Sequence, residues 1–334
     1  MIRSPLVAEV DFEREGAQYG FVRLFHSVHR SAYGYIPIPI VVLKNGAGPT
    51  ALFISGTHGD EYEGQVALCN LARSLTPGMI QGRVILLPAA NLPAAVAGTR
   101  TSPVDEGNLN RLFPGDPLGS PTQQIAHYIE TELVARADMV VDLHSGGSSL
   151  HYVPSVLMMQ DDEDPVRQAA LMAALRAFAS PVSYIGRASP GQGAVRTTSG
   201  AALRQGKLAL GSELGGSGTL SAAGLQVAER GLRNVLAHMG ILPAGEARPG
   251  VTRILDVAGP DYFVYAPGTG LYEPLVEPGD SVAAGQPAAR LHTPETPWAA
   301  VETVRFERAG FVLCKRVPAR TVRGDCLFHL GTDV

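Results

Sequence analysis

The chain has 334 residues, of which 45% are hydrophobic and 17% are charged, and its formal net charge is -4. This length exceeds the size at which a single core usually stops growing, so we expect two domains. The composition is that of a protein able to bury a sizeable core. No basic surface is indicated, which excludes a nucleic-acid partner.

The sequence carries no export or membrane signal. The N-terminus soon reaches the charged stretch 11–15, without the long apolar segment of a secretory signal. No apolar run is long enough for a membrane helix, so no membrane partner is expected. Cys69, Cys314 and Cys326 form neither a C-x-x-C pair nor an even-numbered framework, which favours a cytoplasmic location.

The first part of the chain contains short β-like runs. Residues 36–43 include two prolines, which predict an edge strand because proline cannot donate to a central ladder. The apolar run 50–54 then predicts a buried strand that ends at Ser55-Gly56. From Glu63 onward, apolar residues recur at helical spacing as far as Thr76-Pro77. His58 and Glu61 therefore lie on a loop between a strand and a helix.

A second buried strand is predicted at 84–87. The segment 89–116 that follows is long for a structureless loop, which indicates function. Ser120, with Pro121 at the first helical position and Gln123 reaching back, predicts a capped helix start. The next strand, 139–141, places His144 at its carboxyl end.

Strands and helices continue to alternate over residues 50 to about 240. Helices are predicted at 164–178 and 220–239, with a short strand at 208–210 that leads to Glu213. This alternation predicts an α/β fold with a mostly parallel or mixed sheet flanked by helices.

After Pro243-Ala244-Gly245 the pattern becomes all-β. We therefore predict two domains, an α/β domain over 1–244 and a smaller β-rich domain over 245–334. Residues 279–286 look like the turn and hairpin of a biotinyl/lipoyl-type barrel. A carrier domain of that type needs a lysine, and none lies between Lys207 and Lys315. A structural or access-limiting role is expected for this region.

Two imidazoles and one carboxylate suggest a metal site. His58, Glu61 and His144 form the ligand set that holds one catalytic Zn²⁺ and leaves a fourth position open. Zinc lowers the pKa of a bound water to about 7, which makes a nucleophile without serine or cysteine. Each imidazole needs an acceptor on its other nitrogen, and Asn108 and Asp142 are the candidates. His151, across a Gly-Ser loop from His144, is a weaker candidate for the pocket.

No G-x-S-x-G elbow, Walker loop or G-x-G-x-x-G fingerprint is present, which disfavours serine hydrolases, nucleotidases and dehydrogenases. In order, the chain carries Gly56-Thr57-His58-Gly59-Asp60-Glu61, Asn91-Leu92-Pro93-Ala94, Arg100, Asn108-Leu109-Asn110-Arg111-Leu112-Phe113-Pro114-Gly115, Asp142-Leu143-His144 and Ser212-Glu213-Leu214-Gly215. This ordered set resembles the succinylglutamate desuccinylase/aspartoacylase family, relatives of the zinc carboxypeptidases. The resemblance spans most of the chain.

The resemblance implies a zinc-carboxypeptidase-like fold and a role for each position. Glu213 resembles the general base, and Arg100 resembles the residue that polarises the scissile carbonyl. Asn110 and Arg111 resemble the pair that fixes the carboxylate of an acylated amino acid. Many relatives have aspartate where this chain has Asn108. Family members also carry a C-terminal β-domain that covers the cleft.

The resemblance implies a zinc-dependent amidohydrolase that removes an acyl group from a small N-acylated amino acid. The pattern is closest to the N-acetyl-diaminobutyrate deacetylase branch, and succinylglutamate or N-acetylaspartate are the other substrate types. Two alternatives remain, a zinc carboxypeptidase acting on a peptide or peptidoglycan fragment and a non-catalytic binding or carrier module. The partner expected is a small-molecule substrate, and the sequence leaves a homo-oligomer open.

Overall fold

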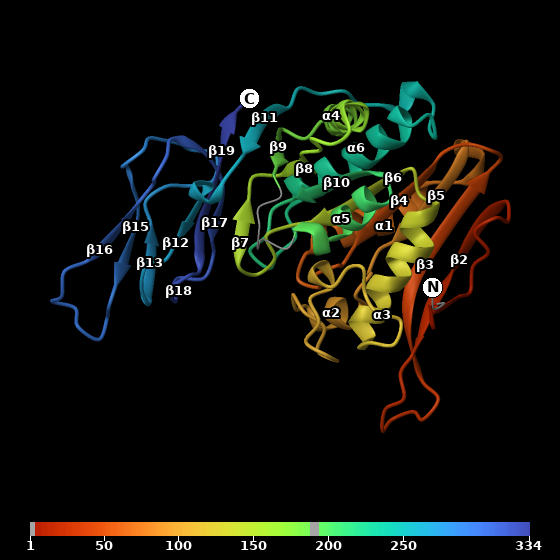
Figure 1. The fold of residues 1–334 in the computed structure, drawn as a ribbon, viewed down its shortest axis with the longest axis horizontal. Helices are drawn as coiled ribbons and strands as arrows, with labels where there is room; N and C mark the ends of the chain where they lie inside the picture. Colours follow the sequence, from red (N-terminus) through yellow and green to blue (C-terminus); the bar gives the residue numbers. More distant parts are fainter. Residues whose placement is uncertain (1–3, 188–193) are drawn as a thin grey trace.

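The computed structural model describes residues 4–187 and 194–334. Its strands form one large mixed sheet and one small antiparallel sheet. Figure 1 shows the small sheet at the opposite end of the molecule from β2 and β3. The strands of the large sheet run in the order β1 (Val7–Ala8), β2 (Gly16–Phe25), β3 (Tyr35–Asn45), β5 (Gly82–Leu87), β4 (Thr50–Ser55), β6 (Met139–His144), β10 (Leu208–Glu213), β8 (Ser155–Met159), β9 (Val182–Gly186), β11 (Arg253–Val257), β19 (Cys326–Asp333), β17 (Gly310–Arg316) and β14 (Ser281–Val282).

Two further strands join the large sheet from the side. These are β12 (Phe263–Tyr265), which pairs with β19, and β7 (Leu150–Tyr152), which pairs with β17. The small sheet has the order β16 (Glu302–Arg305), β15 (Pro287–His292), β13 (Gly270–Pro274) and β18 (Arg320–Thr321).

The helices fill the connections between strands. They are α1 (Tyr62–Ser74), α2 (Leu92–Ala97), α3 (Pro121–Tyr128), α4 (Pro165–Phe178), α5 (Thr198–Arg204) and α6 (Ala222–His238). Short helical turns lie at Pro77–Met79, Leu109–Arg111, Val134–Arg136, Ala194–Arg196, Ala244–Glu246 and Pro260–Tyr262, and a π-helical turn at Ile129–Leu133 extends α3. No helix of the described residues has the length and apolar character that a membrane crossing requires.

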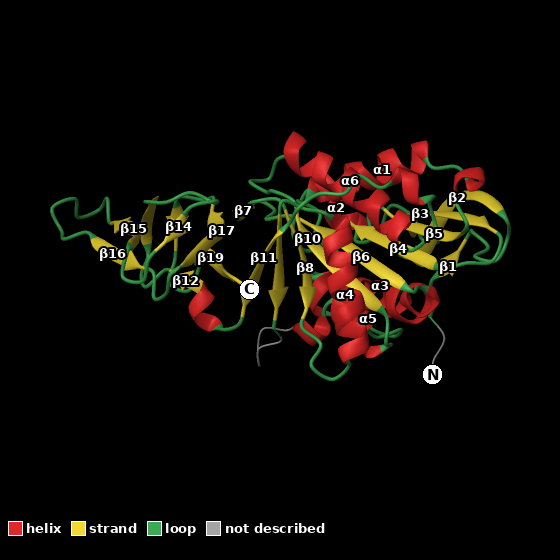
Figure 2. Cartoon of the chain, turned by 90° about the horizontal axis from the view of Figure 1, so that it is seen from above, coloured by secondary structure: helices red, strands yellow, loops and turns green. Residues whose placement is uncertain are grey.

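The central strands are buried on both faces. Along β4, Ala51 and Phe53 belong to one apolar cluster, and Leu52 and Ile54 belong to another. The first cluster includes side chains of α1, α4 and α6, and the second includes side chains of α3 and α5. Figure 2 shows α1 and α6 on one side of the sheet, with α3 and α5 on the other. This two-sided cover explains why these strands read as continuous apolar runs.

The sheet is mixed. β4 pairs in parallel with β5 and β6, β6 with β10, and β9 with β8 and β11, whereas β3, β8 and β19 make antiparallel pairs with β5, β10 and β11. The prediction of an α/β fold with a mixed sheet and flanking helices is confirmed. The predicted helix start at Ser120 is confirmed too, because both halves of the capping box with Gln123 form.

The prediction that residues 36–43 form an edge strand is wrong. β3 lies between β2 and β5 in the sheet. However, β5 pairs only with residues 41–45 of β3, whereas Pro37 and Pro39 pair with Arg23 and Phe21 of β2. The two prolines thus occupy the half of β3 that has a single neighbouring strand, where a missing N–H group interrupts no second ladder.

The strands around residues 279–286 pair with partners outside this segment. β14 pairs with β17 in the large sheet, whereas β15 pairs with β13 and β16 in the small sheet. The turn between them, closed by the Gln286 N–H donating to the carbonyl of Ala283, links two sheets. β14 and β15 therefore do not pair with each other, and the likeness to a biotinyl/lipoyl-type barrel stays a prediction.

Strands from both sides of residue 245 contribute to the large sheet. β11 pairs in parallel with β9, and β7 pairs with β17. The small sheet is built entirely from later residues. The division into domains 1–244 and 245–334 stays a prediction.

Candidate metal centre

The loop between β4 and α1 carries His58 and Glu61. All six residues of β4 are buried, and Glu61 immediately precedes the first residue of α1. A β-carbon at Gly59 would lie 1.9 Å from the carbonyl oxygen of Ala94. Glycine is therefore required where this loop packs on the α2 segment, and the packing fixes the two flanking side chains at the end of a buried strand.

His144 reaches the same place from the neighbouring strand. β6 pairs in parallel with β4, with Ser55 opposite Leu143, and His144 is the last residue of β6. The His144 N–H donates to the hydroxyl of Ser212 on β10 at 3.1 Å, which holds the strand end. Because parallel strands end at a common edge, His144 lies beside the loop that follows β4.

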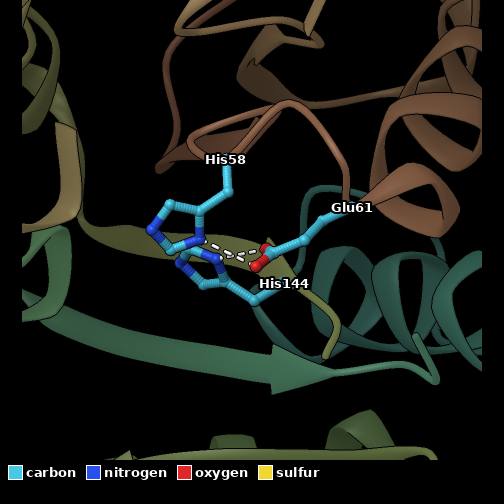
Figure 3. A group of neighbouring side chains, drawn as sticks. All are labelled: His58, Glu61 and His144. Atoms are coloured by element: carbon cyan, nitrogen blue, oxygen red, sulfur yellow. Dashed lines mark hydrogen bonds and ion pairs between the residues drawn. The ribbon is translucent and has the colours of Figure 1, made fainter. Parts of the chain in front are cut away.

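The three side chains converge (Figure 3). Nδ1 of His58 lies 2.8 Å from Oε1 of Glu61, and Nδ1 of His144 lies 2.8 Å from Oε2 of the same carboxylate. One candidate ligand atom from each residue lies within 4.8 Å of the others, and all three residues are less than 9% exposed. The structure thus brings together the three residues that the sequence proposed as ligands.

The outer nitrogen of each imidazole faces a side-chain oxygen. Nε2 of His58 is 3.1 Å from Oδ1 of Asn108, and Nε2 of His144 is 3.0 Å from Oδ2 of Asp142. Asp142 also accepts a hydrogen bond from Thr57 at 3.0 Å. The two residues expected as outer acceptors therefore lie where an acceptor would fix the proton on Nε2 and direct the Nδ1 lone pair inward.

This donor set fits a divalent cation. If both Nε2 atoms donate outward, neither Nδ1 carries a proton when the rings are neutral. Two lone pairs would then face the Glu61 carboxylate at 2.8 Å, which is unfavourable unless a positive charge lies among them. Two neutral imidazoles and one carboxylate are the ligands of catalytic zinc sites with an open fourth position.

Burial and charge oppose each other within this cluster. Burial would raise the pKa of Glu61, but the facing His58 and His144 rings hold it well below its ordinary value. Burial would lower the pKa of His144, but the carboxylates of Asp142 and Glu61 outweigh it and raise that pKa well above the ordinary value. The carboxylate charges make this point of the fold strongly attractive to a cation.

Glu213 lies next to His144. β10 pairs in parallel with β6, with Glu213 opposite His144, so the two residues end adjacent strands. Oε2 of Glu213 is buried and has no hydrogen-bond partner among residues 4–187 and 194–334. Burial and the nearby Glu61 carboxylate raise the pKa of Glu213 well above its ordinary value. A carboxyl group of this kind can carry a proton near neutral pH.

Arg100 approaches the ligand cluster from the long segment after β5. Its Nη1 lies 3.4 Å from Nδ1 of His58 and 3.5 Å from Oε1 of Glu61, and its side chain is 45% exposed. The guanidinium thus places a fixed positive charge between solvent and the candidate metal site.

Asn110 and Arg111 lie on the turn Leu109–Arg111. Oδ1 of Asn110 accepts from the N–H of Thr198 at 3.0 Å, and its Nδ2 lies 3.1 Å from Nε2 of His144. Nη1 of Arg111 donates to the carbonyl of Asn110 at 2.7 Å, and Arg111 is exposed. Asn110 is thus fixed by the backbone of Thr198 and lies beside a candidate ligand, while Arg111 keeps further donors toward solvent.

Two adjoining hollows meet at these residues. The metal pocket, of about 830 Å³ with its solvent-open part, is lined among others by His58, Glu61, Arg100, Arg111, His144 and Glu213. A second hollow of about 1050 Å³ shares Asn110, Arg111, His144, Tyr152 and Glu213 with it. All the predicted catalytic, substrate-binding and ligand residues thus line these two hollows, which share part of their lining.

The sequence did not indicate every residue of the site. Oδ2 of Asp60 accepts from the N–H and the hydroxyl of Ser148 at 2.8 Å each, which ties down the loop after His144. Tyr152 lines both hollows. The loop after His144 contains no recognisable motif that would have indicated its contact with Asp60. Tyr152 could have been proposed as a pocket residue, because it lies on a strand shortly after a candidate ligand. His151 instead lies 3.1 Å from the hydroxyl of Ser217 and is absent from the described lining of both hollows.

Comparisons with known proteins agree with this geometry. Residues 47–239 match the family model of the succinylglutamate desuccinylase/aspartoacylase catalytic domain. The chain is 42% identical over 326 residues to an N-alpha-acetyl-L-2,4-diaminobutyric acid deacetylase from Halomonas elongata, which covers 97% of this chain and 94% of the relative.

Solved structures resemble the whole chain. The product-bound structure of an ectoine utilization protein from Ruegeria pomeroyi has a TM-score of 0.94 and 41% identity, and covers 99% of this chain and 100% of that chain. A succinylglutamate desuccinylase/aspartoacylase from Rhodobacter sphaeroides has a TM-score of 0.93 and 39% identity, with the same coverage of 99% and 100%.

Proposed function

Because the chain belongs to the succinylglutamate desuccinylase/aspartoacylase family, we propose that it is a zinc-dependent amidohydrolase that deacylates a small N-acylated amino acid. The observation that carries this proposal is the convergence of His58, Glu61 and His144 within 4.8 Å. Glu213 lines the same pocket.

The chain is an enzyme, a hydrolase of linear amide bonds. The alternative of a non-catalytic carrier module is therefore wrong for the chain as a whole. For the substrate we propose an N-acetylated diaminobutyrate, supported by the name of the relative that is 42% identical over 97% of this chain. No observation favours the peptide-cleaving alternative, whereas the relative's name is that of an enzyme that acts on a small N-acetylated amino acid.

The metal ligands would be Nδ1 of His58, Nδ1 of His144 and the carboxylate of Glu61. When bound there, a zinc ion supplies a Lewis acid and lowers the pKa of water to about 7. Asn108 and Asp142 would hold the protons on the two Nε2 atoms, which fixes the orientation of the rings and leaves each Nδ1 lone pair for the metal. Zinc is proposed because two imidazoles, one carboxylate and an open position are its usual catalytic set.

Glu213 is the proposed general base. Its carboxylate would take a proton from the attacking water and later deliver that proton to the leaving amine nitrogen. The raised pKa of Glu213 supports the second transfer, because burial and the Glu61 carboxylate make the protonated form accessible. The buried, unpartnered Oε2 supports a role that involves a group absent from the free protein.

Arg100 would stabilise the negative charge that develops on the scissile carbonyl oxygen. Its guanidinium lies within 3.5 Å of candidate ligand atoms and is partly exposed to the pocket. A charge fixed beside the reacting carbonyl favours the transition state more than the substrate, because the oxygen becomes negative only during the reaction.

Asn110 and Arg111 would bind the substrate carboxylate. The planar guanidinium offers two parallel donors to a carboxylate, and one donor of Arg111 is already held by the Asn110 carbonyl. This anchor would place the amide carbonyl of the same amino acid toward Glu213 and the ligand cluster, since all of them line the metal pocket.

The test is release of free amine from a panel of acetyl-, succinyl- and aspartate-type amides, with and without a chelator. We expect turnover of an N-acetyl amino acid, loss of turnover after chelation, and recovery when Zn²⁺ is returned. Turnover that survives complete metal removal would contradict zinc dependence. Cleavage of peptides at higher kcat/KM than every N-acyl amino acid would replace the deacylase by a carboxypeptidase.

A further inference from the structure

The second hollow extends from the metal pocket toward the C-terminal strands. At its metal end are Arg111 and Glu213, and its far wall includes Tyr184 on β9 and His329 on β19. Phe263 on β12 and Tyr152 on β7 complete a wall of rings. We call this space, with its aromatic wall of Tyr152, Tyr184, Phe263 and His329, the aromatic hollow; Tyr152 also lines the metal pocket. The proposed function leaves this wall without a role.

His329 lies at the centre of the wall. Its ring stacks on Phe263 with centroids 4.4 Å apart and an interplanar angle of 7°. Tyr184 and Tyr152 meet the same ring edge-on at 5.6 and 6.0 Å. Three aromatic neighbours therefore fix the imidazole in one orientation, as expected of a group that must present one atom accurately.

One nitrogen of this imidazole is unused. Nδ1 of His329 lies 3.4 Å from the hydroxyl of Tyr152, whereas Nε2 is buried and has no partner among the described residues. His329 is only 4% exposed. A buried polar atom without a partner is rare in native proteins and calls for an explanation, and a ligand group is one that the adjoining hollow permits.

The charge of the hollow restricts the ligand. Burial lowers the pKa of His329 to about 3, so the ring is neutral at physiological pH. Of the charged side chains among the described lining, Arg111 and Glu213 also line the metal pocket, Asp142 faces His144, and Arg187 is 3.3 Å from Asp256. The negative charge of Glu213 also reaches Tyr152 and Tyr184, where it adds to the effect of burial in raising the pKa of each. Among the described residues, the aromatic wall thus offers ring faces and a neutral nitrogen, and Arg187 beside it is already paired with Asp256.

The proposed substrate anchors at the metal end indicate where the side chain of the substrate would lie. In an amino acid, the carbon that bears the carboxylate also bears the acylated nitrogen and the side chain. If the carboxylate lies on Arg111 and the amide faces Glu213, the side chain must leave toward a space that borders both residues. The aromatic hollow borders both of them.

We propose that the aromatic hollow binds the side chain of the substrate amino acid and selects a short chain that ends in an ammonium group, with Nε2 of His329 as the acceptor. This inference rests on the proposed function and extends it by naming the residue that reads the side chain. The ammonium donates one hydrogen to Nε2, while Nδ1–H donates to the oxygen of Tyr152. The faces of the surrounding rings attract the remaining positive charge.

Three substrates of similar length test the inference in the zinc-loaded protein. N-alpha-acetyl-2,4-diaminobutyrate ends in an ammonium group, N-acetylnorvaline carries a methyl group at the same place, and N-acetylaspartate carries a carboxylate. We expect kcat/KM for the first to exceed that for the other two by at least about tenfold, because the methyl group cannot hydrogen-bond to Nε2, whereas a carboxylate would require the other tautomer of His329 and would lie among ring faces that favour positive charge.

Two variants assign the preference to His329. His329→Phe keeps a ring in the stack but removes Nε2, so the ratio between the ammonium and methyl substrates should fall to within about threefold, with kcat/KM for N-acetylnorvaline retained. His329→Gln offers an acceptor at a similar reach and should restore part of the ratio. The change should appear mainly in KM, because the reacting groups are untouched.

The outcomes separate the two proposals. Equal or greater kcat/KM for N-acetylnorvaline or N-acetylaspartate in the unaltered protein overturns the side-chain inference and leaves the deacylase intact. An unchanged ratio in a folded His329→Phe protein overturns the assignment to His329. If the zinc-loaded protein cleaves none of the three amides, this inference fails; if it also releases no amine from the succinyl- and aspartate-type amides of the panel, the proposed function itself fails.

Discussion

Glu213 lies directly opposite His144 in the parallel pairing of β10 with β6. The proposed proton carrier and one proposed metal ligand thus end adjacent strands of a single sheet, with no flexible loop between either residue and its strand. Their relative position is set by backbone hydrogen bonds of the sheet. A substitution at either position should therefore change chemistry with little change in the fold.

Replacing His144 by alanine should abolish both metal binding and turnover. Two ligands remain after the change, which is fewer than a catalytic zinc site uses. Metal content after dialysis and amine release measure the two effects. His238→Ala, at the exposed end of α6, is the matched control and should retain both. Full activity of the His144→Ala protein would show that the ligand is misassigned.

Glu213→Gln should retain zinc but lose most of its rate. The amide keeps the shape of the side chain but cannot accept and return a proton, so kcat should fall by about 10²–10⁴-fold. Zinc content and kcat are measured on the same preparation. The acid limb of the kcat/KM profile, which we assign to Glu213, should disappear in the variant. Unaltered kinetics would remove Glu213 from the mechanism.

In the metal-free protein, Glu213→Gln should be more stable than the unaltered chain at alkaline pH. Burial and the Glu61 charge raise the folded pKa of Glu213, so the unfolded chain loses this proton at a lower pH than the folded protein does. The stability of the unaltered protein therefore falls as pH rises above 4.5, the ordinary pKa, and the variant escapes this loss. Melting temperatures at pH 5 and pH 8 should show a gain that is larger at pH 8.

Glu295→Gln on an exposed loop is the control for that stability measurement. Its melting temperature should follow that of the unaltered chain at both pH values. A gain from Glu213→Gln that is equal at pH 5 and pH 8 would mean that the charge of this carboxylate is not what destabilises the fold.

Asp142→Asn should weaken zinc binding by about 10–100-fold while kcat of the loaded enzyme changes less. The amide oxygen can still accept from Nε2 of His144, 3.0 Å away, but it lacks the charge that makes the imidazole a better ligand. Asn108→Asp is the reverse change at His58 and should tighten binding. Competition with a chelator of known affinity gives both dissociation constants. Tighter zinc binding by Asp142→Asn, or weaker zinc binding by Asn108→Asp, would show that these two residues do not tune the ligands in this way.

Arg100 and Arg111 should separate kinetically. Arg100→Gln removes a charge used as the carbonyl oxygen becomes negative, so kcat should fall by about 10²–10³-fold. Arg111→Gln removes an anchor used equally in substrate and transition state, so KM should rise with kcat little changed. Steady-state kinetics on an N-acetyl amino acid distinguish the two patterns. If both variants changed kcat and KM in the same way, Arg100 and Arg111 would not have the separate roles proposed here.

The sequence predicts those parts of the fold that depend on local patterns. The strand before His58, the helix after Glu61 and the capped start at Ser120 each follow from a short run of residues, and each is present in the structure. His144 lies at the end of its strand for the same reason. The convergence of the three candidate ligands then follows from the rule that parallel strands end at one edge.

Pairings between distant segments are harder to predict. Residues 36–43 look like an edge strand because their two prolines lie in the half of β3 that pairs only with β2. The other half of β3 also pairs with β5, which the local sequence does not indicate. Residues 279–286 look like a hairpin because β14 and β15 are close in sequence, yet each finds its partners in a different sheet. His329 follows no motif, because its environment is assembled from β7, β9 and β12.

The short strand β7 begins six residues after His144 and pairs with β17 through Tyr152 opposite Cys314 and Leu150 opposite Arg316. The C-terminal segment is therefore paired with a strand that borders the proposed active site. A truncated chain that ends before β17 would leave the backbone hydrogen-bonding groups of β7 without their partner strand. It would also lack His329, whose imidazole faces Tyr152. Trimming the protein to a minimal catalyst would accordingly yield an enzyme with a loosened rim, and relatives with altered C-terminal strands should differ in which amides they accept.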